Sequence, residues 1–235
     1  MTIKRGLSIG RSHSLSRAAR HLALAAALAV WPSALCLAND ATGAQWWDTT
    51  GFKVDINSDW STTAEEEFRV DGDSGLYYHH WDIGLGYAGL AEWIDVSLNF
   101  RQVYDKDDDG EWRQENQPHV NVTVADTFAG IACSTRSRFE YRDRVGGEDN
   151  WRYRNKVTFG LPWELTPLKV KPYVADEVFI NMDGSGYSQN RFYAGGVLSL
   201  AKNVKLDLYY LWQSTRADPG RDNIHAIGTK LVFLF

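Results

Sequence analysis

The sequence has little cysteine, little proline and no long apolar run after its first residues. Its 235 residues include two cysteines and six prolines. Cys133 is the only cysteine after residue 38, so that part cannot form an internal disulfide. No stretch there approaches the roughly 18 apolar residues of a membrane-spanning helix, and helical periodicity is almost absent. These absences argue against a disulfide-stapled secreted domain and against a helical membrane protein.

The first 38 residues have the pattern of a secretory signal peptide. They carry five basic and no acidic residues, then the apolar run Leu22 to Val30, then Cys36-Leu37-Ala38, with cleavage expected after Ala38. The run is too short for an anchor and Pro32 follows it, while the bulky Leu35 disfavours a lipoprotein signal. Without this segment the net charge falls from −5 to −10, because five of 25 basic residues leave and all 30 acidic ones stay. An acidic exported protein is a poor candidate for binding nucleic acid.

Strict alternation of apolar and polar residues recurs along most of the remaining chain and predicts β-strands that each bury one face. In one such stretch Trp81, Ile83 and Leu85 oppose His80, Asp82 and Gly84. Aromatic residues make up 13% of the chain although the mean hydropathy is only −0.38. Many aromatics without apolar runs are typical of a transmembrane β-barrel, whose residues alternate between lipid and lumen.

The last stretch, residues 223–235, is the most apolar strand and ends on Phe235. A soluble sandwich is the other interpretation, but its exposed apolar edge would promote aggregation. A closed barrel removes that edge by pairing the last strand with the first. Gly228, Leu231, Phe233 and Phe235 also resemble the carboxy-terminal signal that the outer-membrane barrel assembly machinery reads. That machinery and outer-membrane lipid are therefore the expected partners, and a monomer is expected.

The connections alternate in the sequence between long polar loops and short turns, as in bacterial outer-membrane barrels. We predict an all-β, antiparallel transmembrane barrel in the bacterial outer membrane, with both ends in the periplasm and hence an even strand number. Ten strands are expected, or twelve if Trp46-Trp47 and residues 52–57 add a hairpin. The predicted organisation is a signal peptide over 1–38, an amino-terminal segment over 39–50 and one barrel domain over 51–235.

Several motifs resemble a family of uncharacterised bacterial outer-membrane proteins known as a domain of unknown function. These motifs are RSRFEYR from Arg136, WRYR from Trp151, KPYVADEVFIN from Lys171 and QNRFYAGG from Gln189. The resemblance covers most of the chain after residue 38 and is looser before Thr135. It implies an outer-membrane barrel and carries no known activity.

Charged residues gather on the polar faces of the predicted strands and form two walls of the lumen. The basic wall comprises Arg136, Arg138, Glu140, Arg142, Arg152, Arg154, Lys156, Lys171, Glu177 and Arg191, with Glu177 and Arg191 expected to pair. The opposing acidic wall comprises Glu65, Glu67, Asp82 and Asp95. One interpretation is a transverse field that selects charged solutes in a narrow pore. The other, which we favour, is a salt-bridge network that fills a small lumen.

No catalytic constellation stands out. Asp105, Asp107 and Asp109 open a calcium-loop pattern, but Asn116 occupies the position of the closing glutamate, so calcium is a weak expectation and no other cofactor is expected. His79, His80, His119 and His225 have no evident serine partner, so the sequence predicts no enzymatic activity. The leading function is structural or a narrow passive channel for small anionic solutes. The alternative is an outer-membrane enzyme that acts on lipid or lipopolysaccharide.

Overall fold

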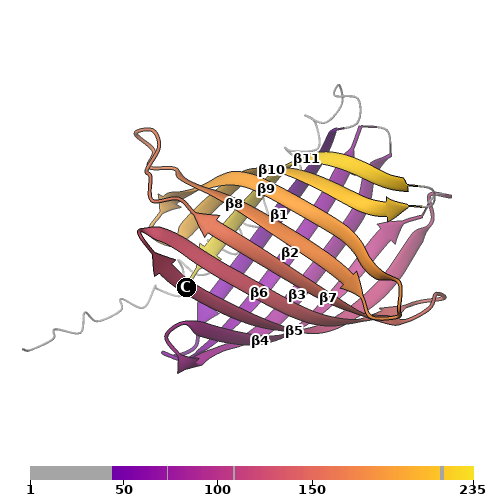
Figure 1. Cartoon of the computed structure of the whole chain (residues 1–235), viewed down its shortest axis with the longest axis horizontal. Helices are drawn as coiled ribbons and strands as arrows, with labels where there is room; N and C mark the ends of the chain where they lie inside the picture. Colours follow the sequence, from indigo (N-terminus) through magenta and orange to yellow (C-terminus); the bar gives the residue numbers. More distant parts are fainter. Residues whose placement is uncertain (1–43, 73, 108, 218–219) are drawn as a thin grey trace, which may run out of the picture. The chain divides into compact units, whose positions relative to one another are not determined.

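The computed structural model describes residues 44–235 except 73, 108 and 218–219, so the predicted signal peptide lies outside the described residues. In that part of the chain no helix has the length and apolarity of a membrane span. Eleven strands follow one another (Figure 1). They are β1 (Ala44–Asp55), β2 (Trp60–Asp71), β3 (Gly75–Ala91), β4 (Ile94–Lys106), β5 (Trp112–Phe128), β6 (Ile131–Arg144), β7 (Asn150–Gly160), β8 (Lys171–Asn181), β9 (Gly186–Ala201), β10 (Val204–Ala217) and β11 (Gly220–Leu234).

The strands form one closed barrel in which each is hydrogen-bonded to its neighbours in sequence. The predicted fold class is therefore confirmed. Ten of the eleven pairings are antiparallel, and the barrel closes through β1 and β11, which run parallel from the pair Ala44–His225 to the pair Lys53–Leu234. The expectation of an even strand number is wrong, because residues 44–55 form one strand and not a hairpin. That strand begins within the segment 39–50 that the sequence set apart.

Because β1 and β11 run parallel, Ala44 and Phe235 lie at opposite ends of the barrel. We call these the Ala44 end and the Phe235 end. The amide of Asp55 donates to the carbonyl of Phe235 at 3.0 Å, so β1 finishes where the chain stops and starts at the other end. Most of the polar stretches expected as long loops extend the strands instead. The connection 161–170 is the longest between the described strands and lies at the Phe235 end, although its part 163–167 reads in the sequence as a short turn.

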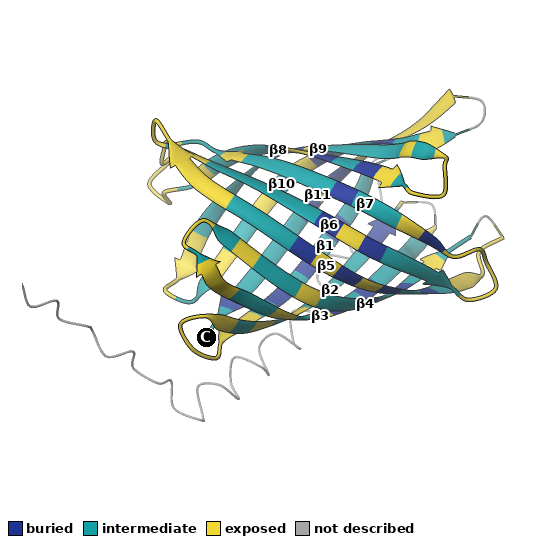
Figure 2. Cartoon of the chain, turned by 60° about the horizontal axis from the view of Figure 1, so that its bottom comes forward, coloured by how far each residue is buried: buried dark blue, intermediate teal, exposed yellow. Residues whose placement is uncertain are grey.

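The alternation read from the sequence sets the two faces of the barrel wall. Large apolar side chains point outward and are exposed, as Leu98 at 64% and Ile83 at 52%. Trp93 and Trp151 are exposed outside near opposite ends, where aromatic residues of a transmembrane barrel form interfacial girdles. Buried positions recur at every second residue along the strands (Figure 2). The wall therefore has an apolar exterior and a lumen that is largely polar.

An apolar cluster fills the lumen beside the closing strands. It consists of Trp47, Ala175, Tyr193, Leu211 and Ala226. Next to it, Tyr209 on β10 lies over Gly228 of β11, where a Cβ would come within 2.0 Å of the tyrosine ring. Gly228 is thus required by packing inside the lumen, whatever it contributes to assembly.

Outside the wall, Phe233 of β11 stacks on Phe52 of β1 with ring centroids 5.2 Å apart. This contact covers the seam at which the barrel closes. The proposed reading of the last strand by the assembly machinery stays a prediction.

Candidate functional site

Most residues of the predicted basic wall lie inside the lumen, and the two carboxylates among them are deeply buried. Glu140 is fully buried and accepts hydrogen bonds from Arg152 and Arg154, while Arg138 lies 3.9 Å away. Glu177 contacts Arg154 at 2.8 Å and Arg136 at 3.0 Å. A buried carboxylate between several guanidiniums is stabilised only while those partners remain. This network of ion pairs lies inside the lumen, between strands β6, β7 and β8.

Two members of the predicted wall differ from expectation. Lys171 lies at the Phe235 end, where its exposed ammonium group faces Glu164. Arg191 is opposite Glu177 in register but does not pair with it, since its Nε donates to Gln213 Oε1 at 2.7 Å. Glu177 accepts from Tyr193 at 3.0 Å in addition to its two arginines. The strand register placed the two residues side by side, but side-chain packing gave each a different partner.

The predicted acidic wall is neutralised by cations that the sequence reading did not assign to it. Glu67 bonds Arg69 at 2.7 Å, and Asp82 bonds Arg101 at 2.9 Å. Lys230 of β11 bonds Glu65. Asp95 lies apart, near the turn that joins β3 to β4. The same alternation that placed Glu67 in the lumen places Arg69 there, so these arginines were readable from the sequence. Acidic and basic groups are interleaved and do not form two opposed walls.

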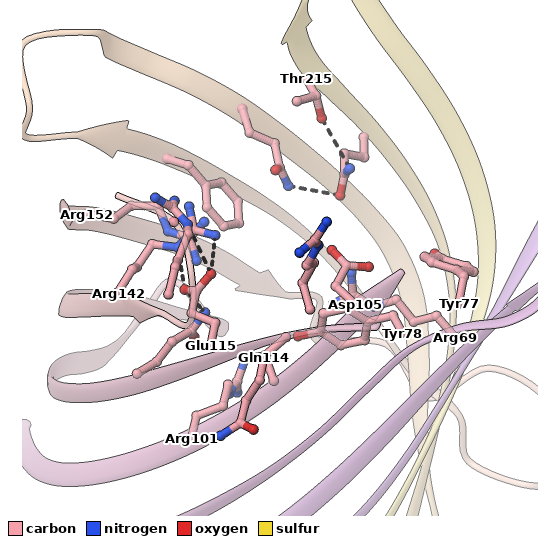
Figure 3. A pocket seen from close by; sticks show the side chains of 18 of the residues that line it. Arg69, Tyr77, Tyr78, Arg101, Asp105, Gln114, Glu115, Arg142, Arg152 and Thr215 are labelled. Atoms are coloured by element: carbon pink, nitrogen blue, oxygen red, sulfur yellow. Dashed lines mark hydrogen bonds and ion pairs between the residues drawn. The ribbon is translucent and has the colours of Figure 1, made fainter. Parts of the chain in front are cut away.

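A cavity of about 930 Å³ opens inside the barrel toward the Ala44 end (Figure 3). A second one, of about 460 Å³, lies toward the Phe235 end. Arg69, Arg101, Arg154 and Arg191 line both cavities, so they form the layer between them. The first cavity has eight arginines but only three carboxylates on its wall. Those carboxylates are Asp105, Glu115 and Asp222.

The layer between the cavities alternates guanidinium groups with aromatic rings. Arg69 lies 3.8 Å from the centre of the Tyr78 ring and 3.7 Å from that of Trp47. Arg191 continues the series, at 4.9 Å from Trp47 and 4.9 Å from Phe179. Cation–π contact stabilises charge that has left water, so this layer holds several guanidiniums in place beneath the cavity.

A second polar site lies on the outer wall. His79 of β3 and Glu66 of β2 point outward, and Nε2 of the histidine is 3.0 Å from the glutamate Oε1. Phe68 and Tyr104 lie parallel to the imidazole on its two flanking strands, with ring centroids at 4.5 Å and 6.1 Å. The sequence reading missed this pair. The signal was available, because both residues are polar exceptions on faces that otherwise meet lipid.

Polar contacts continue around the outer wall from this pair. Gln102 accepts from the Trp81 indole at 3.1 Å and donates to Asn116 at 3.2 Å, and Asn116 donates to Asp143. Trp81, Gln102 and Asn116 are directly opposite one another on neighbouring strands, in the same row as Glu66. Polar side chains that face lipid cost free energy and tend to be functional. This row of polar side chains is therefore a candidate functional site.

The calcium pattern is not assembled as a metal site. Asp105 lines the lumen cavity, away from the loop. Asp107 Oδ1 accepts the amides of Asp109 and Glu111, and Oδ2 accepts from Arg113 Nε at 2.7 Å. That hydrogen bond holds the pKa of Asp107 below its ordinary value. Among the described residues no three His, Cys, Asp or Glu side chains are grouped to hold a metal ion.

Comparison with known proteins gives a family and solved structures of similar fold, of which LpxR is one. The model of the family "Protein of unknown function (DUF2490)" matches residues 44–224. LpxR from Salmonella typhimurium has the same fold, with a TM-score of 0.51 and 10% sequence identity, over 79% of this chain and 87% of LpxR. The search of curated proteins gives no match. The likeness to LpxR contradicts the sequence-based expectation that the chain has no enzymatic activity, and at 10% identity it shows a shared fold alone.

Proposed function

Since the chain belongs to the DUF2490 family of unknown function and has an outer-membrane-type barrel like that of LpxR, we propose that it is an outer-membrane hydrolase. Its substrate is an acyl ester of a membrane lipid, and His79 with Glu66 is its catalytic pair. LpxR is a lipid A deacylase. An identity of 10% supports the shared fold alone, so the chemistry is argued from this chain's own residues.

The geometry of the outer-wall pair carries the proposal. An ionised carboxylate can only accept a hydrogen bond, so the contact between Glu66 Oε1 and His79 Nε2 places the proton on Nε2. Nδ1 then holds the free lone pair, and it has no hydrogen-bond partner within the described part of the chain. A histidine oriented by a carboxylate, with its other nitrogen free, is the arrangement of a general base.

The depth of the pair suits an ester of a lipid. Along the outer face of β3 the side chains pass from His79 through Trp81 to the exposed Ile83 and Leu85, that is from polar through aromatic to apolar. Aromatic residues mark the boundary between headgroups and hydrocarbon. Lipid esters lie at the same boundary. The pair is nearer the Ala44 end. The prediction that both ends face the periplasm does not hold, because Ala44 and Phe235 lie at opposite ends of the barrel. With the Phe235 end in the periplasm, the Ala44 end is the outward one.

The expected reaction is hydrolysis with water as nucleophile. His79 Nδ1 takes a proton as the oxygen of water attacks the ester carbonyl, and Glu66 stabilises the resulting imidazolium. When the tetrahedral intermediate breaks, the bond from carbonyl carbon to alkoxide oxygen is cleaved and the imidazolium returns its proton to that oxygen. The products are a free fatty acid and an alcohol.

The test is fatty-acid release, measured by mass spectrometry, from lipopolysaccharide and from phospholipid mixed with the folded barrel in detergent. Wild type should release acid, and His79→Gln and Glu66→Gln should lose about 10²–10⁴-fold of the rate. His225→Gln is the matched control, because His225 also faces outward but contacts Tyr210. Unchanged rates in His79→Gln, or no release by wild type from either lipid, would overturn the proposal.

A further inference from the structure

The cavity at the Ala44 end lies inside the barrel and is separate from the outer-wall pair. Arg142 and Arg152 reach into it close to Glu115, and Asp105 and Arg69 line it from β4 and β2 (Figure 3). We propose that this cavity binds a phosphorylated polyhydroxyl group, such as a phosphosugar. The inference does not depend on the hydrolase activity.

Arginines outnumber carboxylates in the cavity wall and in the ion-pair network beside it. Glu115 contacts two arginines, Glu140 three and Glu177 two, so six arginines share three carboxylates. These arginines are Arg136, Arg138, Arg142, Arg144, Arg152 and Arg154. Uncompensated like charges inside a low-dielectric lumen repel one another. An anion in the cavity would offset that repulsion.

The excess positive charge of the cavity wall is located at Arg191. Among the described residues no carboxylate lies within ion-pair distance of it, and its Nε is bonded to the neutral amide of Gln213. Phe179 holds it at 4.9 Å, and the same ring has Arg154 at 4.4 Å and Arg152 at 5.5 Å. Three guanidiniums thus gather around one ring at the cavity floor. Planar guanidiniums bind phosphate through paired hydrogen bonds, which makes phosphate the anion of choice.

A buried amide indicates what else the ligand carries. Gln117 lines the cavity, is only 4% exposed, and donates from Nε2 to Glu115 at 2.6 Å. Its Oε1 is buried and has no hydrogen-bond partner. An acceptor left unpaired in a cavity is satisfied by a ligand hydroxyl. The volume of about 930 Å³ also exceeds what a bare ion needs and suits a sugar-sized group.

The test measures calorimetric binding to the full barrel in nanodiscs, with glucose 1-phosphate, glucose and inorganic phosphate as soluble probes. Glucose 1-phosphate should bind at least about tenfold more tightly than either other probe, because it satisfies both the arginines and Gln117. Arg191→Gln should weaken it about tenfold or more, and Gln117→Leu should reduce it to the level of inorganic phosphate. Arg221→Gln is the matched control, since Arg221 is near the same end but is not part of the cavity wall.

A second arm separates a lipid headgroup from a free solute. Nanodiscs that contain a phosphorylated glycolipid should compete with glucose 1-phosphate if the natural ligand is a lipid, and should not compete if it is a free solute. Equal affinity for glucose and glucose 1-phosphate, or an equal effect of Arg191→Gln and Arg221→Gln, would overturn the inference. His79→Gln should leave this binding unchanged, so failure of the hydrolase proposal would be seen separately.

Discussion

Replacing Glu140 by glutamine removes one negative charge and almost no volume from the middle of the lumen. The side chain is 0% exposed and lies between Arg152, Arg154 and Arg138. Removing one partner from a buried ionic network costs about 3–5 kcal/mol, because the remaining charges lose their compensation. Arg154 keeps Glu177 at 2.8 Å, which places the expected loss toward the lower end of that range.

Urea unfolding of the barrel in lipid vesicles, followed by its tryptophan fluorescence, measures this loss. Glu164→Gln is the control, since Glu164 forms only exposed pairs with Lys169 at 3.7 Å and Lys171 at 3.9 Å, worth at most about 1 kcal/mol. Adding Arg152→Gln to Glu140→Gln should restore part of the stability, because it removes one uncompensated charge. If Glu140→Gln costs no more than Glu164→Gln, the buried network does not hold the lumen together.

Three other predictions concern the seam, the glycine in the last strand and the acidic loop. In a Cys133→Ser background, Thr50→Cys with Leu231→Cys should cross-link, because these residues are direct partners in the parallel pairing of β1 and β11, whereas Thr50→Cys with Ile227→Cys should not. Gly228→Ala should lower the yield of folded barrel in detergent, and Tyr209→Ala in the same chain should restore it by clearing the ring that lies 2.0 Å from the added Cβ. The pKa of Asp107, measured by carbon NMR, should lie below its ordinary value and should rise in Arg113→Gln. A lowered folded-state pKa means that the loop contacts are present at neutral pH and are lost as the pH falls through that value.

Alternation placed individual side chains on the correct face of the wall, yet it did not predict their partners. Glu177 and Arg191 are register neighbours, as expected, but Arg191 turns toward Trp47 and Phe179. The basic cluster could therefore be predicted as a set of lumen residues, while its sharing of carboxylates could not. Contacts across a lumen depend on strands that are distant in sequence, and a period of two carries no information about them.

The outer-wall pair shows a second limit of prediction from the sequence. His79 and Glu66 are separated by a strand turn in sequence and meet only because β2 and β3 pair in the observed register. A polar residue on a lipid-facing position was visible in the sequence as an exception to the alternation. That two such exceptions touch was decided by the pairing of β2 with β3.

The sequence by itself determined a barrel wall with an apolar outside, because a period of two sustained over many strands can bury its polar face only by closing on itself. Tertiary structure decided the strand number and the direction of closure, because residues 44–55 alternate equally well as one strand or as part of a hairpin. It also decided that the lumen is filled at mid-height with a cavity above, because that depends on how long side chains from facing strands meet.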